Sequence, residues 1–279
     1  MRIENNLVTL EMYPDESDRM LIGSSSIQGT RKYQEDAVFG KVYQHKTLAV
    51  LCDGMGGLDD GALASNTAIN SIREGFEQEE IEEVPLFFRQ QARIADEKVA
   101  MLTAEDGTQL SCGSTVVAVI VRKNKLHWLS VGDSRIYIVR NKEILAVNEE
   151  HNYKAELNKL LMENRITKEY YESEIYRGEA LTSYIGMGNV RLMDVNEFPF
   201  ELIPGDYVIL CSDGMYRTLV EEEIYRIVTE HGDEVQAAAT KLTDQVVEKG
   251  KKNQDNTSVI VLRYSQKYQE EDFNEVSKM

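Results

Sequence analysis

The chain has 279 residues, 42% of them hydrophobic and 28% charged, and a formal net charge of -17 at pH 7. This composition is typical of a soluble globular protein and argues against disorder, while the length permits either one domain or two. The negative charge repels nucleic-acid phosphates and anionic lipids, and the longest basic cluster is Lys249 to Lys252. We therefore expect neither nucleic-acid nor membrane binding.

The start of the chain and the cysteines indicate a cytoplasmic protein. The first residues, MRIENNLVTLEMYPDE, lack the apolar core of a secretion signal, and the longest aliphatic run, Val116–Val121, is too short to span a bilayer. Cys52, Cys112 and Cys211 are odd in number, lie in or beside apolar runs and show no CxxC spacing. We expect them to be reduced core residues.

The first third of the chain predicts strands followed by helices. Residues 1–19 are polar and are predicted to form a lead-in. Apolar runs predict strands over Met20–Ile27, Ala37–Tyr43 and Thr47–Cys52. Helical spacing of apolar residues predicts helices over Asp59–Gln78, with Asp59 or Asp60 as cap, and over Val84–Thr103. Two successive amphipathic helices predict a helical layer.

The middle of the chain changes to short β-rich runs. Strands are predicted over Ser114–Val121, Leu126–Val131, Arg135–Arg140 and Glu143–Val147. Because short turns join them, we expect one antiparallel meander. Residues 148–190 have no strong periodicity, and we expect a mobile flap there with one short helix over Tyr153–Glu163.

The last third repeats the strand-then-helix order. A strand is predicted over Tyr207–Cys211, helices over Glu221–Thr229 and Glu234–Glu248, and a final strand over Ser258–Tyr264. The remaining residues, 265–279, are predicted to form a loose acidic tail.

Acidic residues stand at the ends of these strands. Asp53 directly follows an apolar strand and is itself followed by Gly54, and the pair Asp213-Gly214 repeats this arrangement; Asp36 and Asp255 also border strands. A single Asp-Gly pair is more often an ordinary turn, and the alternative here is a set of unrelated turn acids. Strand ends that converge on one cleft would instead bring the acids together in a single domain.

Carboxylates without histidine or cysteine partners select hard cations such as Mg²⁺ or Mn²⁺. A carboxylate shared between two ions is how two-metal hydrolases are built, and Asp53 is the natural bridge. Without cations, clustered acids would repel and raise one another's pKa values. The sequence therefore predicts a divalent metal site.

Six motifs occur in a specific order along the chain. They are RKYQEDA (31–37), LCDGMGG (51–57), CGSTVVAVIV (112–121), VGDSRIY (131–137), LCSDGM (210–215) and QDNTSVIVL (254–262). In this order they resemble the PP2C-type metal-dependent protein serine/threonine phosphatases, the PPM family, in its short bacterial-type form. The resemblance implies a phosphatase domain over residues 20–264 with an α+β fold, a four-layer αββα sandwich of two antiparallel sheets flanked by helices.

The resemblance also implies metal ligands. Asp53 would bridge two ions, the Gly54 carbonyl would bind the first, and Asp213 and Asp255 would bind the second. Asp36 would hold a ligand position or a metal-bound water.

Three further residues receive roles from the same resemblance. Glu35, like Asp36, would hold a metal-bound water or a ligand position. Arg31 would bind the substrate phosphate through its planar fork of donors. Asp133 matches the acid assigned to a third, weaker metal.

The implied reaction is hydrolysis of phosphoserine or phosphothreonine in proteins that a serine/threonine kinase has phosphorylated. A water bridging two Mn²⁺ or Mg²⁺ ions would attack the phosphorus in line, without a covalent phosphoenzyme. The alternative is a catalytically silent module that binds phosphoproteins or regulates a partner. Loss of the metal-binding acids would be its signature, and all of them are present.

Two positions depart from the family pattern. Met55 stands where some relatives carry a histidine proposed as general acid, and methionine cannot donate a proton. Arg217 stands where many relatives carry a further acid. The alternatives are that Arg217 turns outward to solvent or that it pairs with Asp133. Because a guanidinium that pairs with Asp133 would oppose a weakly held cation, we expect two ions and no well-occupied third.

Overall fold

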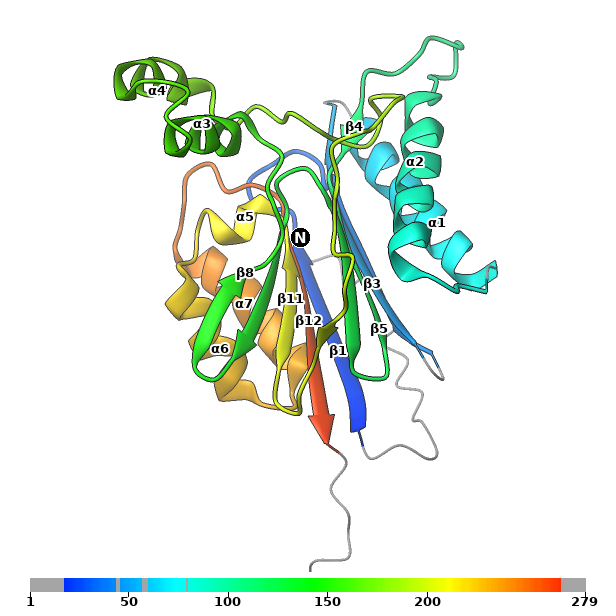
Figure 1. The fold of residues 1–279 in the computed structure, drawn as a ribbon, viewed down its shortest axis with the longest axis vertical. Helices are drawn as coiled ribbons and strands as arrows, with labels where there is room; N and C mark the ends of the chain where they lie inside the picture. Colours follow the sequence, from blue (N-terminus) through cyan, green and yellow to red (C-terminus); the bar gives the residue numbers. More distant parts are fainter. Residues whose placement is uncertain (1–17, 44–45, 57–59, 79, 267–279) are drawn as a thin grey trace, which may run out of the picture.

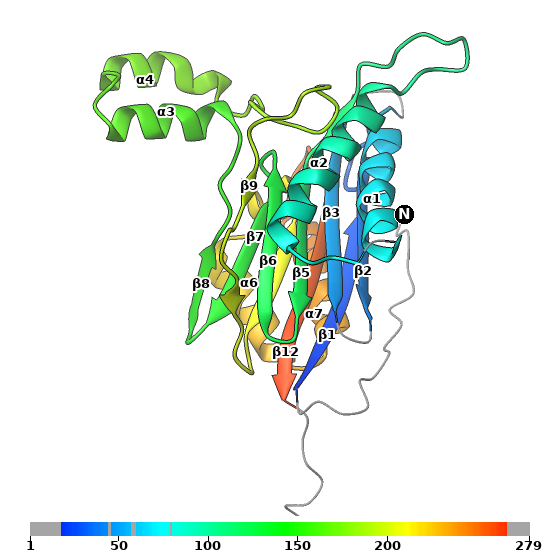
Figure 2. The ribbon, with the colours of Figure 1, turned by 45° about the vertical axis from the view of Figure 1, so that its right-hand side comes forward.

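Two antiparallel β-sheets stack face to face in the computed structural model, which describes residues 18–43, 46–56, 60–78 and 80–266 (Figures 1 and 2). One sheet has the strand order β1-β12-β11-β7-β8; the other has the order β10-β6-β5-β3-β2, with β4 paired to β3 and β9 to β6. The strands are β1 (Asp18–Ile27), β2 (Asp36–Val42), β3 (Thr47–Met55), β4 (Gly113–Ser114), β5 (Val116–Arg122), β6 (Lys125–Val131), β7 (Arg135–Arg140), β8 (Glu143–Ala146), β9 (Asp194–Val195), β10 (Phe200–Glu201), β11 (Tyr207–Cys211) and β12 (Thr257–Gln266).

Helices cover the outer face of each sheet. Those that cover a sheet are α1 (Asp60–Gln78), α2 (Val84–Ala100), α6 (Glu221–His231) and α7 (Val235–Glu248). The others are α3 (Tyr153–Met162), α4 (Lys168–Glu174), the 3-10 helix η1 (Ile175–Arg177) and α5 (Asp213–Tyr216). Helices α1 and α2 share an apolar core with β3, β5 and β6, whereas α6 and α7 share one with β1, β11 and β12. A third core fills the space between the sheets. The predicted four-layer αββα sandwich of the α+β class is confirmed (Figure 1).

Strand β3 is apolar on both faces because both faces are covered. Leu48, Val50 and Cys52 belong to the core shared with α1 and α2, while Ala49 and Leu51 belong to the core between the sheets. All five side chains are completely buried. This double burial explains the uninterrupted apolar run, and it fixes the end of the strand, where the first acidic turn begins.

The predicted meander over residues 114–147 is wrong in one respect. Its strands form two hairpins in different sheets, since β5 pairs with β6 in one sheet and β7 pairs with β8 in the other. The chain changes sheet at Gly132, whose φ of 103° is open to glycine and strained for other residues. A hairpin pattern predicts antiparallel neighbours but does not encode which sheet each hairpin joins.

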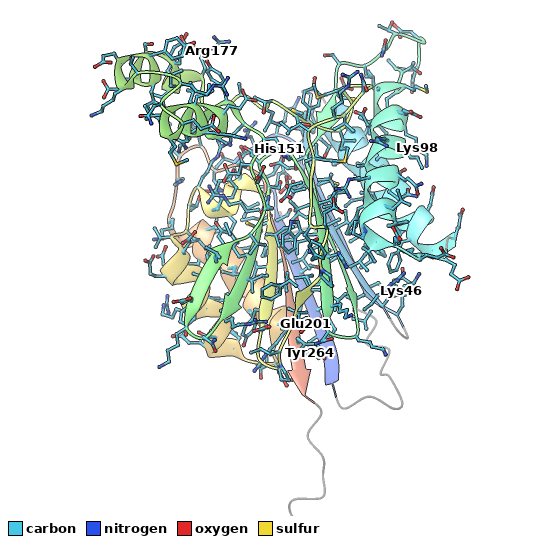
Figure 3. All side chains as sticks on the ribbon, viewed as in Figure 1. Lys46, Lys98, His151, Arg177, Glu201 and Tyr264 are labelled. Atoms are coloured by element: carbon cyan, nitrogen blue, oxygen red, sulfur yellow. The ribbon has the colours of Figure 1, made fainter. Side chains whose placement is uncertain are left out.

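Residues 148–190 include a projecting arm formed by α3, α4 and η1, with Arg177 on the arm and His151 at its base (Figures 2 and 3). The predicted helix in this segment is confirmed as α3. The structure adds α4 and η1, in which none of the residues is buried, so the sequence had no apolar periodicity to show. The mobility of the arm stays a prediction.

The base of the arm is joined to the turn between β6 and β7. The backbone N–H of His151 donates to the Gly132 carbonyl at 2.8 Å, and the Gly132 N–H donates to Nδ1 of the buried His151 ring at 3.1 Å. The arm is therefore anchored next to Asp133.

Some predictions fall outside the described residues. These are Gly57, the possible cap Asp59, and most of the predicted lead-in (1–19) and tail (265–279). Within the described ranges, none of the helices combines the length and the apolar character that crossing a membrane requires. The three cysteines are free; Cys52 and Cys211 are buried as predicted, but Cys112 is partly exposed and is not a full core residue.

Candidate metal centre

The predicted acids come together where strands of both sheets end. Asp36 and Asp53 lie directly opposite each other in the β2–β3 pair. Asp213 begins α5 immediately after β11, and Asp255 lies two residues before β12. The negative charges of the other acids, and of Asp133 in the β6–β7 turn, all act on the carboxyl of Asp53. The structure thus brings these acids from separate strands into one region.

Burial and mutual repulsion raise the pKa values of these carboxyls. Burial is the main cause of the pKa of Asp53 lying well above its usual range, and the charges of Asp36 and Asp213 add to it. Burial also raises the pKa of Asp36 to about 7, although hydrogen bonds from Ser258 and Ser212 act in the opposite direction. Ionising such a cluster is unfavourable unless a positive charge lies among its members.

The two carboxylate oxygens of Asp36 differ in their hydrogen bonding. Its Oδ2 accepts a hydrogen bond from Ser212 Oγ at 2.8 Å, whereas its Oδ1 is buried without a partner among the described residues. A buried acceptor without a donor is costly, and carboxylate oxygens are the ligands that Mg²⁺ and Mn²⁺ prefer. The donor set therefore fits a hard divalent cation. The described side chains do not form a ready-made ligand group, because no three His, Cys, Asp or Glu residues among them converge on one point.

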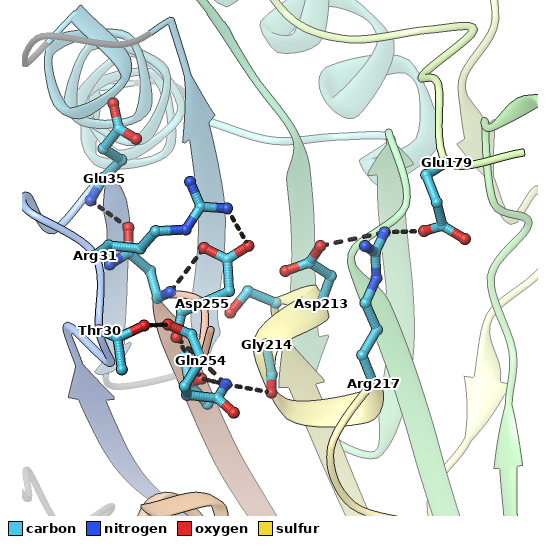
Figure 4. Close-up of polar contacts among 12 residues, drawn as sticks. Thr30, Arg31, Glu35, Glu179, Asp213, Gly214, Arg217, Gln254 and Asp255 are labelled. Carbon is cyan, nitrogen blue, oxygen red and sulfur yellow. Dashed lines mark hydrogen bonds and ion pairs between the residues drawn. The ribbon is translucent and has the colours of Figure 1, made fainter. Parts of the chain in front are cut away.

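Arginines hold two of the acids. Arg31 Nη2 donates to Asp255 Oδ2 at 2.6 Å (Figure 4). The Arg31 side chain is 56% exposed, so other donors of its planar guanidinium face solvent. Arg31 is thus placed at the site by Asp255, as expected for a residue that binds a substrate anion.

Arg217 contacts three carboxylates. Its Nη2 lies 3.2 Å from Asp213 Oδ2 and also pairs with Glu179 (Figure 4). The same nitrogen lies 3.3 Å from Asp133 Oδ2. The hydroxyl of Tyr216 donates to Asp133 Oδ2 at 3.4 Å. The predicted contact between Arg217 and Asp133 is confirmed. Glu179 was missed, because it lies in a segment without periodicity, far from the strand-end motifs.

Asp133 and Asp213 respond to this guanidinium in the same way. Burial raises the pKa of Asp213 to about 6, and Arg217 is the strongest opposing influence. Burial likewise raises the pKa of Asp133, again against the effect of Arg217. Arg217 therefore supplies positive charge on the side of the acidic cluster that faces the arm.

Glu35 and Gly54 are placed by close backbone contacts. The Gly54 N–H donates to the Glu35 carbonyl at 3.1 Å. A Cβ added to Gly54 would lie 2.1 Å from the carbonyl oxygen of Gly61, and one added to Gly61 would lie 2.4 Å from Glu35 Oε1. Only glycine permits this approach of β3, the Glu35 loop and the start of α1.

Asn256 joins the loops that carry Arg31, Glu35 and Asp255. Its Oδ1 accepts from the Glu35 N–H at 2.9 Å, and its Nδ2 donates to the carbonyls of Gln28 and Tyr33 at 2.8 and 2.9 Å. Asn256 belongs to the motif QDNTSVIVL, but no role was predicted for it. Its place inside an acid-bearing motif, directly after Asp255, was the available signal.

Gln254 connects the same loop to the second acidic turn. Its Nε2 donates to the Gly214 carbonyl at 3.0 Å, and its carbonyl accepts from the Thr30 backbone and hydroxyl (Figure 4). Asn256 and Gln254 thus hold the acid-bearing loops in register.

Comparison with known proteins agrees with this arrangement. The family model described as protein phosphatase 2C matches residues 22–249. The chain is 28% identical over 187 residues to protein phosphatase PhpP of Streptococcus pneumoniae, which is 66% of this chain and 73% of PhpP. It is 26% identical over 205 residues to the serine/threonine phosphatase stp of Listeria welshimeri, 71% of this chain and 78% of that protein.

The fold has solved counterparts. The crystal structure of the catalytic domain of the serine/threonine protein phosphatase PstP, in complex with two manganese ions, superposes with a TM-score of 0.71 at 23% identity, over 89% of this chain and 100% of that one. The family match spans most of the sandwich and includes every acid of the cluster except Asp255, which lies just beyond it. The chain belongs to the protein phosphatase 2C family of serine/threonine protein phosphatases.

Proposed function

We propose that this phosphatase works with two divalent cations, Mn²⁺ or Mg²⁺, held by Asp36, Asp53, the Gly54 carbonyl, Asp213 and Asp255. The observation that carries the proposal is the pair Asp36–Asp53, two acids directly opposite each other in the β2–β3 pair. Asp36 is buried, and its Oδ1 has no hydrogen-bond partner among the described residues. When bound, the ions supply charge stabilisation at the phosphoryl group and activation of a water. The chain's own residues place the substrate.

Arg31 is the proposed phosphate-binding residue. Asp255 holds one of its nitrogens, which leaves the exposed part of the guanidinium to bind phosphate oxygens. Met55, which follows the acidic turn, has no proton to donate, so the leaving alkoxide must be protonated by solvent or by another side chain. Glu35 is also part of the proposed site, and its carboxylate lies directly beside Gly61 at the start of α1.

The proposed catalytic domain covers residues 20–264. Its substrates are proteins carrying phosphoserine or phosphothreonine, the products of serine/threonine kinases. We also propose a cytoplasmic location, where the free thiols of Cys52, Cys112 and Cys211 stay reduced.

Counting bound manganese tests the proposed ligands. Wild-type protein and the Asp213→Asn variant would be stripped of metal with chelator, dialysed into metal-free buffer and titrated with Mn²⁺ by calorimetry. Asp244→Asn on α7 is the matched control. We expect two strong sites in the wild type and in the control, and the loss of at least one in Asp213→Asn. Two unchanged sites in Asp213→Asn would remove this residue from the ligand set.

A further inference from the structure

A groove opens next to the candidate metal centre. It has a volume of about 720 Å³ and starts at Met55 and Gly56, the residues that directly follow Asp53 and Gly54. One wall is the loop that joins α2 to β4, and the other is the segment 179–186 that returns from the projecting arm to β4 (Figure 1). Whatever occupies the groove therefore adjoins the acidic cluster.

The wall formed by the returning segment is fixed by the sandwich. Ser114 and Ile185 exchange two backbone hydrogen bonds, of 2.9 and 2.8 Å. The buried carboxylate of Asp96, on α2, accepts from the N–H groups of Gly186, Gly188 and Val190 at 2.7, 3.2 and 2.8 Å. Backbone donors that converge on a buried carboxylate make this wall rigid.

The opposite wall is also held by hydrogen bonds. The Leu110 N–H donates to the Leu102 carbonyl at 2.9 Å, and the Gln109 side chain donates to the Ala100 carbonyl at 2.8 Å. With both walls fixed, the groove is formed before any ligand binds, which lowers the entropic cost of binding.

The chemistry of the lining selects an uncharged partner. Leu110, Leu181 and Tyr184 offer partly exposed apolar surface, and the Tyr184 ring lies so close to Gly113 that an added Cβ would be 2.6 Å from it. Among the described residues that line the groove there is no lysine or arginine, and their one carboxylate, on Glu179, is paired with Arg217. In a chain with a net charge of -17, such a groove disfavours acidic side chains and accepts apolar ones.

We propose that the groove binds the substrate polypeptide beside its phosphorylated residue and selects an apolar side chain there. This inference rests on the proposed function, because the phosphorylated residue must lie at the acidic cluster for its neighbour to reach the groove. Because the lining residues Met55 and Gly56 directly follow Asp53 and Gly54 in the chain, we assign the occupant to the substrate. Leu110 and Leu181 are then specificity-determining residues.

Substitution of these leucines tests the proposal. Leu181→Gln and Leu110→Gln would be compared with Leu145→Gln, a matched change at a 66% exposed leucine on β8. The substrates are a phosphothreonine peptide series with leucine or serine at one neighbouring position at a time, and para-nitrophenyl phosphate, which is too small to enter the groove while bound at the centre.

For the wild type, we expect leucine at one or more of the neighbouring positions to give a lower KM than serine at the same position. The two groove variants should raise the KM of that leucine peptide by roughly tenfold. The serine peptides and para-nitrophenyl phosphate should keep their kinetics, and Leu145→Gln should match the wild type. Equal effects on leucine and serine peptides, or no effect on either, would overturn the proposal. A wild type that hydrolyses none of the substrates with Mn²⁺ would instead overturn the proposed function, and this inference with it.

Photo-crosslinking gives a readout independent of turnover. A phosphopeptide with benzoylphenylalanine at the preferred position should label residues 109–113 or 179–186, as mapped by mass spectrometry. Labelling confined to the outer helices of the arm, or to the far end of the sandwich, would contradict the assignment.

Discussion

Arg31 and Arg217 both form ion pairs with acidic residues of the site, but in different ways. Arg31 binds Asp255 and leaves part of its guanidinium exposed, whereas Arg217 is divided among Asp133, Asp213 and Glu179. The first arrangement keeps donors free for an incoming phosphate. The second places a permanent cation where the family resemblance implies a weakly held metal. The two residues are therefore expected to respond differently to substitution.

Removing Arg31 should weaken substrate binding more than catalysis. In Arg31→Ala we expect KM for a phosphopeptide to rise by about tenfold or more, because a charge-assisted contact to phosphate is lost while the metal ligands remain. Steady-state kinetics at saturating Mn²⁺ measure this, and Lys32→Ala, the adjacent cation, is the control. An unchanged KM together with weakened Mn²⁺ binding would show that Arg31 acts by holding Asp255.

Reversing the charge at Arg217 should create a cation site. Arg217→Asp changes the local charge by two units beside Asp133, which favours a divalent ion there. Calorimetric titration and anomalous diffraction with millimolar Mn²⁺ should show two ions in the wild type and a third, bound by Asp133, in the variant. Arg226→Asp, the same change on the exposed face of α6, should bind as the wild type does. A fully occupied third ion at Asp133 in the unmodified protein would refute this account.

At the scale of elements, Asp96 connects α2 to the segment that follows the projecting arm. Asp96→Ala should lower the free energy of unfolding by about 3 kcal/mol, because three backbone N–H groups lose a charged acceptor in a buried place. Urea denaturation measures the loss, with Glu97→Ala, its exposed neighbour, as the control. A change below roughly 0.5 kcal/mol, within the range of ordinary surface substitutions, would mean that water or other groups replace this carboxylate.

Elements that bury apolar residues were predictable from the sequence, and those that do not were not. Strand β11 matches its prediction at both ends because all five of its residues are buried. Helix α4 buries none and gave no signal. At Gly132, where the chain changes sheet, an added Cβ would lie 2.7 Å from the Thr115 side chain, and local periodicity does not contain this close approach.

The site likewise has residues that the local sequence pattern predicts and contacts that it does not. Its acids were predictable, since each borders an apolar strand and chemistry limits what clustered carboxylates can bind. The contacts that support them were not predictable. Glu179 reaches Arg217, Asp96 reaches Val190 and Asn256 reaches Gln28 across long stretches of sequence, and each pairing exists only once the layers are assembled.

For the molecule as a whole, the raised pKa values link metal binding to stability. The pKa values of Asp36 and Asp213 are raised to about 7 and about 6 from an ordinary value of 3.8, mainly by burial. Without metal, the native state therefore binds more protons than the unfolded state between about pH 4 and 7, so these groups destabilise the protein as pH rises through that window. Bound Mn²⁺ would offset the cost of ionising these carboxyls.

The gain in melting temperature on adding Mn²⁺ should therefore grow from pH 5 to pH 7.5. Thermal melts in chelator and in Mn²⁺ at each pH measure that difference, and Asp36→Asn should flatten it. A gain that is independent of pH, or that is largest at pH 5, would contradict the placement of the ions among these buried carboxyls.

The central claim is that Asp53 holds the metals that drive phosphate hydrolysis. Its most direct test is the Mn²⁺-dependent turnover of a phosphothreonine peptide by the wild type and by Asp53→Asn, each with and without chelator, after circular dichroism has shown that both are folded. We predict activity that requires Mn²⁺ in the wild type and a decrease in kcat on the order of 10³-fold in the variant, since metal charge stabilisation contributes several kcal/mol. Turnover by the wild type in excess chelator, or near-normal turnover by Asp53→Asn at saturating Mn²⁺, would contradict the account.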